Sequence, residues 1–114
     1  ACADPYHPRT VRATMGAVFR QNILCVSVGE LKTLLHRWKL PVFGAVLSER
    51  AQNVLHCDLS VCAVAVGSEG QGLSGELRSL CDGEVIIPMQ PCSESLNAAV
   101  AASILMWEMR RGRL

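Results

Sequence analysis

The sequence predicts an α/β fold with a mostly parallel sheet, and three observations support this. Half of the 114 residues are hydrophobic but only 4% are aromatic, so the core must be built from Ala, Val, Leu and Ile, as in a sheet covered by helices. Short apolar runs at residues 41–48, 61–67 and 83–88 have the length of strands buried on both faces. Helical patterns alternate with these runs, which favours parallel strands joined by helices. The length is that of one domain or of part of one.

Two helices are expected before the first strand. Pro8 suits the first turn of a helix, where its missing N–H has no partner to lose, and the apolar spacing predicts a helix over residues 9–19. Residues 28–39 repeat apolar positions on one helical face and stop before Pro41, which predicts a second, amphipathic helix. After the first strand, the polar residues 49–60 are predicted to form a surface connection.

The second half of the chain is expected to alternate strands with helices. After the strand at 61–67, a short helix is predicted from Ser74 or Gly75 through ELRSLC. The strand at 83–88 and a long apolar helix over about residues 96–111 complete the chain. The predicted order is therefore helix, helix, strand, strand, helix, strand, helix.

The segment IPMQPCSESLN, residues 87–97, carries more polar groups than a helix needs in order to begin. The candidate N-caps for the last helix are Ser93, Ser95 and Asn97. Only one cap is required, so capping leaves the other polar groups unexplained. In open parallel sheets, ligands bind beyond the carboxyl ends of the strands. The segment is expected at that edge, together with the loops that follow Leu47 and Val66, and is predicted to be part of a binding site.

Residues 67–72 read GSEGQG between a strand and a helix, a position typical of nucleotide-binding loops. The spacing is not that of the dinucleotide fingerprint, and no Gly-Lys-Ser/Thr follows as in a phosphate loop. Glycines let the backbone approach a ligand closely, but a tight structural turn would use them too. Glu69 could orient a hydroxyl, an amine or an arginine, or it could be solvated. The motif alone leaves these alternatives open.

Charge and cysteine usage exclude some classes of protein. The net charge of +1 argues neither for nor against a polyanionic partner, and on charge alone the arginine-rich ends are interpreted as solvated. Six cysteines without C-x-x-C spacing, and without a histidine at zinc-ligand spacing, indicate buried reduced thiols in a cytoplasmic protein and no metal site. The longest apolar run, residues 98–107, is half of the roughly 20 residues that span a bilayer. No Ser/His/Asp or Cys/His arrangement can be identified, so hydrolytic chemistry is set aside.

Three segments, taken in order, resemble the SpoU (TrmH-type) RNA ribose methyltransferases of the SPOUT superfamily. They are HPRTVRATMGAVFR, VAVGSEGQGLSGEL and VIIPMQPCSESLNAAVAASILMWEM. The second is similar to the family's GNEGxGLS loop and the third to its IPMxGxxESLNVSVA loop and helix. The resemblance covers essentially all of residues 1–114. It implies a C-terminal trefoil knot, one of the rare exceptions to unknotted chains.

The resemblance also implies a cofactor, partners and site residues. It implies S-adenosyl-L-methionine as methyl donor, a ribose 2′-hydroxyl of rRNA or tRNA as acceptor, and a homodimer that needs neither metal nor membrane. The cofactor-binding residues implied by position are Leu47, Ser48, Gly67, Ser68, Glu69, Gly70, Ile87, Met89, Ser95, Leu96 and Asn97. The implied catalytic residues are Glu69, Ser95 and Asn97, and the expected RNA-binding residues are Arg9, Arg12 and Arg20.

The chain departs from the family pattern at defined positions. Ser68 stands where the family has Asn, and Pro91 stands where it has Gly. The family's first motif, N-x-G-x-x-x-R with the catalytic arginine, would lie before Ala1, so residues 1–114 are expected to be the C-terminal, knotted part of the domain. The chain alone is then expected to bind the cofactor without catalysing methylation. The alternatives are a non-catalytic RNA-binding or dimerisation module on the same fold, and an unrelated nucleotide-binding α/β enzyme.

Overall fold

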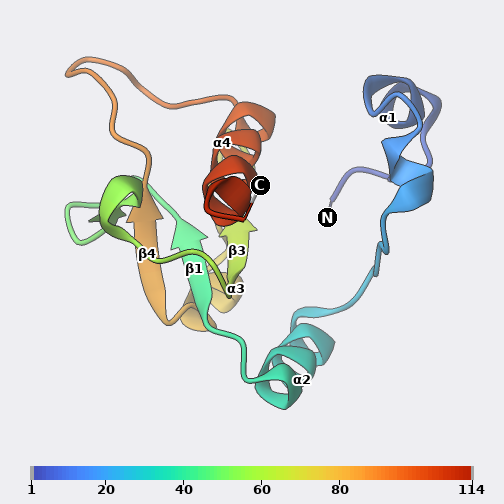
Figure 1. Ribbon diagram of the computed structural model, residues 1–114, viewed down its shortest axis with the longest axis horizontal. Coiled ribbons are helices and arrows are strands. Elements are labelled where there is room, and N and C mark those ends of the chain that lie inside the picture. The colour runs from blue at the N-terminus through green and yellow to red at the C-terminus, as the bar shows by residue number, and fades with distance from the viewer. Residues whose placement is uncertain (1, 114) are drawn as a thin grey trace.

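A four-stranded parallel sheet organises the computed structural model, which describes residues 2–113 (Figure 1). The strands are β1 (Val42–Ala45), β2 (Gln52–Asn53), β3 (Ala63–Val66) and β4 (Gly83–Ile86). The α-helices are α1 (Pro8–Ala13), α2 (Val28–Trp38), α3 (Gly75–Ser79) and α4 (Ala98–Arg111). Two 3₁₀ helices, η1 (Ala17–Arg20) and η2 (Val54–His56), complete the elements. The predicted parallel α/β class is confirmed.

The strand order β2-β4-β1-β3 places β1 inside the sheet. Strand β1 pairs in parallel with β3 along its whole length and with β4 from Phe43 to Ala45. The chain therefore enters β3 on one side of β1 and returns to β4 on the other. Because all pairings are parallel, the carboxyl ends of these three strands meet at one edge, which is where open sheets of this kind bind ligands.

Successive residues of a strand point to opposite faces of the sheet, and different helices cover the two faces here. Leu105 of α4 and Val85 of β4, each only 1% exposed, belong to the core cluster on one face, and Figure 1 shows α4 lying across the sheet. On the other face, a Cβ on Gly44 would lie 2.9 Å from Leu73 Cδ1 and 3.0 Å from Cys81 Sγ. The segment around α3 therefore packs tightly over the middle of β1 on that face.

The single helix predicted over residues 9–19 is wrong. Helix α1 ends at Ala13 and is followed by the 3₁₀ helix η1. Met15 and Gly16, with φ of 50° and 81°, adopt left-handed backbone conformations, which an α-helix cannot accommodate. The apolar spacing continues across this break, so periodicity alone did not reveal it.

The expectation of a polar surface connection at residues 49–60 is also wrong in part. This segment contains the short edge strand β2, which pairs with β4, and the 3₁₀ helix η2. Val54 and Leu59 are only 4% and 3% exposed and belong to the core cluster. Two apolar side chains thus anchor a segment whose overall composition is polar.

The predicted amphipathic helix is confirmed as α2, and a capping box explains where it begins. The Ser27 side chain accepts a hydrogen bond from Glu30 N at 3.1 Å, while Ser27 N donates to Glu30 Oε2 at 2.7 Å. The helix ends at Trp38, and its C-cap residue Lys39 adopts a left-handed conformation before Pro41. Ser74 caps α3 through its side chain alone, since its hydroxyl accepts from Leu77 N at 3.2 Å. The predicted starts of both helices are therefore confirmed within one residue.

The six cysteines are all free, but the expectation that they are buried is wrong for most of them. Only Cys62 is buried; Cys57 and Cys81 are half-buried, and Cys2, Cys25 and Cys92 are exposed. Helix α4 is likewise less covered than its composition suggests, because Trp107 remains 57% exposed. Within residues 2–113, no helix has the length and apolar character that crossing a membrane requires.

Candidate functional site

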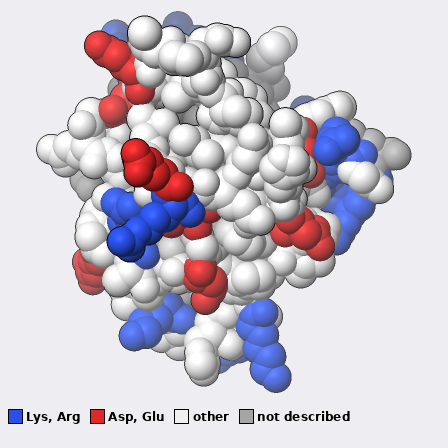
Figure 2. Space-filling view, turned by 90° about the vertical axis from the view of Figure 1, so that its left-hand side faces the viewer, with Lys and Arg blue, Asp and Glu red and all other residues white. Residues whose placement is uncertain are grey.

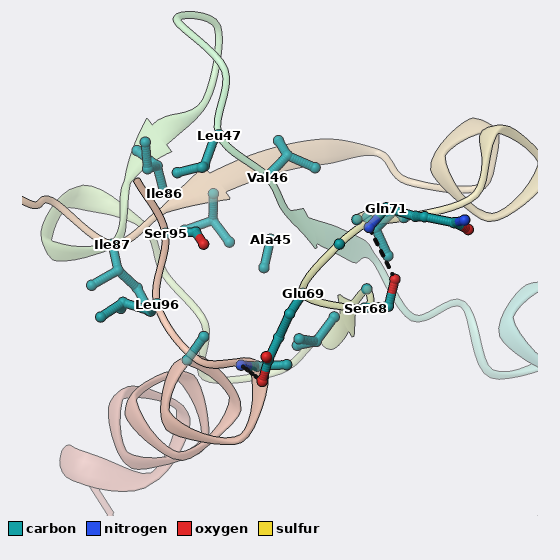
Figure 3. Close-up of a pocket in the computed structure, with 18 of the residues that line it drawn as sticks. Ala45, Val46, Leu47, Ser68, Glu69, Gln71, Ile86, Ile87, Ser95 and Leu96 are labelled. Atoms are coloured by element: carbon teal, nitrogen blue, oxygen red, sulfur yellow. Dashed lines mark hydrogen bonds between the residues drawn. The ribbon is translucent and has the colours of Figure 1, made fainter. Parts of the chain in front are cut away.

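A cleft of ≈ 360 Å³ lies at the carboxyl edge of the sheet (Figure 3). It is formed by the loops that follow β1, β3 and β4 and by the first turns of α4. Its apolar wall includes Ala45, Val46, Leu47, Ile86, Ile87 and Leu96. The cleft thus has the character of a small-molecule site, which is mostly apolar with a small number of placed polar groups. The polar side chains that line it are those of Ser68, Glu69, Gln71, Arg78 and Ser95.

The GSEGQG loop forms a closed turn over this cleft. Gly72 N donates to Ser68 O at 2.8 Å, and Gln71 N donates to the Ser68 hydroxyl at 3.2 Å. A Cβ on Gly67 would lie 2.1 Å from Gly72 C, which leaves no space for any side chain there. Gly72 itself has a φ of 66°, in the region that glycine adopts most easily. The loop needs these two glycines for its own closure, and that closure places its backbone against the cleft.

Glu69 links the glycine-rich loop to the start of α4. Its Oε1 accepts hydrogen bonds from Asn97 Nδ2 at 2.5 Å and from the Ala98 backbone N–H at 3.3 Å. A carboxylate at this place also interacts favourably with the positive end of the helix dipole. The two loops that carry the polar motifs are thus joined directly, although 28 residues separate Glu69 from Asn97 in the sequence.

Asn97 is the N-cap of α4. Its Oδ1 accepts from Ala99 N at 3.0 Å and from Val100 N at 3.3 Å. Among the candidate caps, Ser95 instead lines the cleft, and Ser93 does neither. The polar residues of the segment 87–97 are therefore divided between a helix start and a cleft wall.

Most of the predicted cofactor residues lie together. The residues of that set that line the cleft are Leu47, Gly67, Ser68, Glu69, Gly70, Ile87, Met89, Ser95 and Leu96. Ser48 and Asn97 do not line it: the Ser48 hydroxyl accepts from Arg50 N at 3.1 Å, and Asn97 reaches the cleft only through Glu69. The roles assigned to all of these residues stay predictions.

Sequence reasoning missed several residues of the cleft. Val46 directly follows β1 and Ile86 is the last residue of β4. Because both strands were expected to end at this edge, the predicted topology could have indicated these two residues. Arg78, on α3, gave no such signal, because its position depends on a contact with Glu84 six residues later. Within residues 2–113, Glu69 and Arg78 are the two charged side chains that line the cleft.

The arginines expected to bind RNA lie away from the cleft lining. Arg9 and Arg12 are on α1 and Arg20 is on η1, and all three are exposed. In Figure 1 this N-terminal segment stands apart from the sheet. Figure 2 shows the side of the molecule that lies at the left in Figure 1. Acidic and basic side chains are intermixed on that side, with no patch of one sign.

Three of the six thiols lie in surroundings that disfavour a nucleophilic thiolate. Burial raises the pKa of the Cys81 thiol, and the nearby carboxylates of Glu84 and Asp82 raise it further. Burial likewise raises the pKa of Cys57 and of Cys62. These thiols stay protonated near neutral pH, whereas the thiolate is the reactive form.

Comparison with known protein families gives a match along nearly the whole chain. The sequence model of the SpoU rRNA Methylase family matches residues 1–107. A Staphylococcus epidermidis protein named as a TrmH-family tRNA/rRNA methyltransferase is 46% identical over 107 residues, which are 90% of this chain and 41% of that protein.

Solved structures with the same fold carry related names. The SpoU methyltransferase AviRb from Streptomyces viridochromogenes, in complex with the cofactor AdoMet, superposes with a TM-score of 0.87 at 32% identity, over 98% of this chain and 47% of that chain. An RNA 2′-O ribose methyltransferase superposes with a TM-score of 0.85 at 31% identity, over 99% of this chain and 44% of that chain. The present chain therefore spans less than half the length of these relatives.

Proposed function

We propose, since this chain belongs to the SpoU rRNA Methylase family, that it forms the cofactor-binding part of an S-adenosyl-L-methionine-dependent RNA methyltransferase. The proposed acceptor is a ribose 2′-hydroxyl of rRNA or tRNA. The observation that carries the proposal is the apolar cleft at the carboxyl edge of the sheet, closed by the glycine-rich loop. The AdoMet complex of one structural relative and the 2′-O ribose chemistry named for another support it.

The cleft fits a ligand of this kind in size and in character. Its volume of ≈ 360 Å³ falls in the range of about 300–1,000 Å³ that is usual for small-molecule sites. Apolar side chains from the ends of β1 and β4, among them Leu47 and Ile87, are suited to the faces of an adenine ring. Because Gly67 carries no side chain, the loop can close on its own backbone at Gly72 and lie along the cleft, where its backbone N–H and C=O groups can bind the ring edges.

The proposed methyl transfer requires that the acceptor oxygen be oriented and that the 2′-hydroxyl lose its proton. S-adenosylmethionine supplies a methyl group that its sulfonium already activates, so no metal is required. The residues of the chain must align the acceptor oxygen with that methyl group and help the 2′-hydroxyl to lose its proton. Glu69 and Ser95 line the cleft and can take part directly, while Asn97 orients Glu69 through its amide. We therefore assign Asn97 a positioning role within the proposed catalytic set.

Further proposals concern partners and location. We propose that the protein works as a homodimer in the cytoplasm, on an RNA that Arg9, Arg12 and Arg20 help to bind, and that its C-terminal part is threaded as a trefoil knot. Exposed apolar side chains on α4, including Met106 and Trp107, support association with a second copy. Sedimentation at several concentrations tests the homodimer: a chain that stays monomeric at high concentration would contradict it.

Two assays separate the proposed function from the non-catalytic alternative on the same fold. Isothermal titration of the 114-residue chain with S-adenosylmethionine should show saturable one-site binding, whereas a module that has lost the pocket would show none. Transfer of radiolabelled methyl groups to rRNA or tRNA should be absent from the isolated chain, because none of residues 1–114 matches the arginine-containing first motif of the family. Robust methylation by this chain would refute that assignment of roles.

A further inference from the structure

The two charged side chains that line the cleft approach it from opposite faces of the sheet. Glu69 is bound to the start of α4, the helix that covers the face to which Val85 belongs. Arg78 extends from α3 to Glu84, which neighbours Val85 on β4 and so points to the opposite face. The cleft therefore has a negative group at one side and a positive group at the other.

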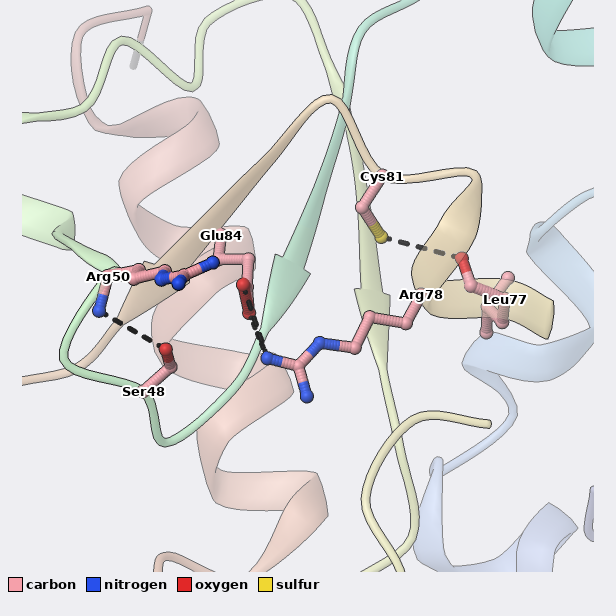
Figure 4. A network of polar contacts seen from close by, with 6 residues as sticks. All are labelled: Ser48, Arg50, Leu77, Arg78, Cys81 and Glu84. Carbon is pink, nitrogen blue, oxygen red and sulfur yellow. Dashed lines mark hydrogen bonds and ion pairs between the residues drawn. The ribbon is translucent and has the colours of Figure 1, made fainter. Parts of the chain in front are cut away.

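Arg78 is held in place by an ion pair that leaves part of its guanidinium free to bind a ligand (Figure 4). Its Nη2 donates to Glu84 Oε2 at 2.8 Å and to Oε1 at 3.2 Å. Within residues 2–113, Nη1 and Nε of Arg78 make no hydrogen bond. The Arg78 side chain is 51% exposed and that of Glu84 is 22% exposed. One nitrogen thus fixes the group, while the side chain as a whole stays half-exposed.

We infer that Arg78 is a specificity-determining residue that binds the carboxylate at the amino-acid end of the methyl donor. This inference rests on the proposed function. S-adenosylmethionine has one anionic group, this carboxylate, and Arg78 is the cationic side chain among the described residues that line the cleft. A guanidinium matches a carboxylate in shape and in charge. Glu69, on the other side, would repel the same group, so the two charges together orient the donor.

Glu84 has a supporting part in this arrangement. Without it, the long Arg78 side chain would sample many rotamers, and ordering it on binding would cost conformational entropy. Because Glu84 lies on β4, in the middle of the sheet, it presents Arg78 from a rigid element. The pair therefore pre-organises the site, beyond any contribution to the stability of the fold.

The test compares two ligands that differ at the carboxylate. S-adenosylmethionine and its decarboxylated form share the adenosine, the sulfonium and the amine. A charge-assisted hydrogen bond at a half-exposed site should favour the carboxylate form by about tenfold in affinity. In Arg78→Gln this preference should disappear, through weaker binding of S-adenosylmethionine and unchanged binding of the decarboxylated ligand. Arg37→Gln, an exposed arginine on α2 outside the cleft, should leave both affinities unchanged.

Two further variants separate recognition from folding. Arg78→Gln leaves the Glu84 carboxylate without its partner, so the double variant Arg78→Gln/Glu84→Gln removes both charges together. It should also lose the preference between the two ligands while binding the decarboxylated one normally. Arg78→Lys should keep part of the preference, because it retains the charge but not the planar fork.

Each other outcome identifies which proposal fails. If the wild-type chain binds neither ligand, the proposed function fails and this inference fails with it. If it binds both ligands equally, or if Arg78→Gln weakens both to the same extent, the cofactor assignment survives and Arg78 is not the carboxylate contact. If Arg78→Gln weakens only the binding of an RNA fragment, the guanidinium contacts a phosphate, and the inference is overturned.

Discussion

Gly67→Ala should open the glycine-rich loop, and the structure indicates how severely. The added Cβ would lie 2.1 Å from Gly72 C and 2.3 Å from both Gly72 O and Leu73 N, whereas ordinary contact begins near 3.4 Å. All three atoms belong to the backbone, so no change of rotamer can relieve the overlap. The loop must move, which breaks the 2.8 Å hydrogen bond from Gly72 N to Ser68 O. We expect a loss of about 3 kcal/mol in the free energy of unfolding, the upper part of the usual range for overpacking.

Urea denaturation followed by circular dichroism measures this loss, and the same chain offers matched controls. Gly70→Ala and Gly75→Ala add the same methyl group where nothing lies within 4 Å. Both controls should stay within about 0.5 kcal/mol of the wild type, or be slightly more stable. Gly67→Ala should also bind S-adenosylmethionine much more weakly than Gly75→Ala does, because the loop forms one wall of the cleft. Equal stability of Gly67→Ala and Gly70→Ala would refute this description of the loop.

Three other predictions concern the cap, an acidic group and the thiols. Asn97→Ala should lower the free energy of unfolding by about 1 kcal/mol in urea denaturation, because it removes the N-cap of α4 and a partner of Glu69; an unchanged midpoint would count against the cap. Hydrogen bonds from Ser27 lower the pKa of Glu30 below 4.5, so its contribution is present above that pH and lost as the pH falls through the folded-state value. The difference in thermal midpoint between wild type and Glu30→Gln should therefore vanish at low pH, and a constant difference would contradict this. With iodoacetamide at pH 8, mass spectrometry should show slower alkylation of the three thiols whose pKa burial raises than of the exposed ones, and equal rates would contradict it; these three are Cys57, Cys62 and Cys81.

The positions of the strands, and the sheet edge at which the cleft lies, could be predicted from sequence because the strands depend on local composition. Short apolar runs such as VCAVAVG, bounded by turn residues, favour strands of a parallel sheet, and parallel pairing then brings the strand ends together. The strand that this run forms, β3, is only half-buried because it lies at the edge of the sheet. The helix starts were equally local, since a polar residue followed by a helical pattern marks a cap. Asn97 was one of three candidates, and the structure distinguishes it from Ser95 because the Asn97 side chain accepts from Ala99 N and Val100 N, whereas Ser95 lines the cleft.

The features that sequence reasoning missed depend on contacts between distant residues or on single backbone conformations. The left-handed turn at Met15 and Gly16 interrupts an apolar pattern without changing its spacing. Strand β2 has two residues and exists because β4 offers it a partner. Arg78 reaches the cleft because Glu84 holds it there, and neither residue belongs to a motif. Burial of the cysteines failed as a prediction for a similar reason, because composition gives the average exposure of a residue type and not the place of each residue.

The measurement that tests the central claim most directly is isothermal titration of the 114-residue chain with S-adenosylmethionine, repeated with Gly67→Ala and Gly75→Ala. We expect saturable binding at one site per chain, with an affinity that Gly75→Ala preserves and Gly67→Ala largely abolishes. Absence of binding to the folded wild-type chain, or binding that Gly67→Ala leaves unchanged, would contradict the assignment of this cleft as the cofactor site.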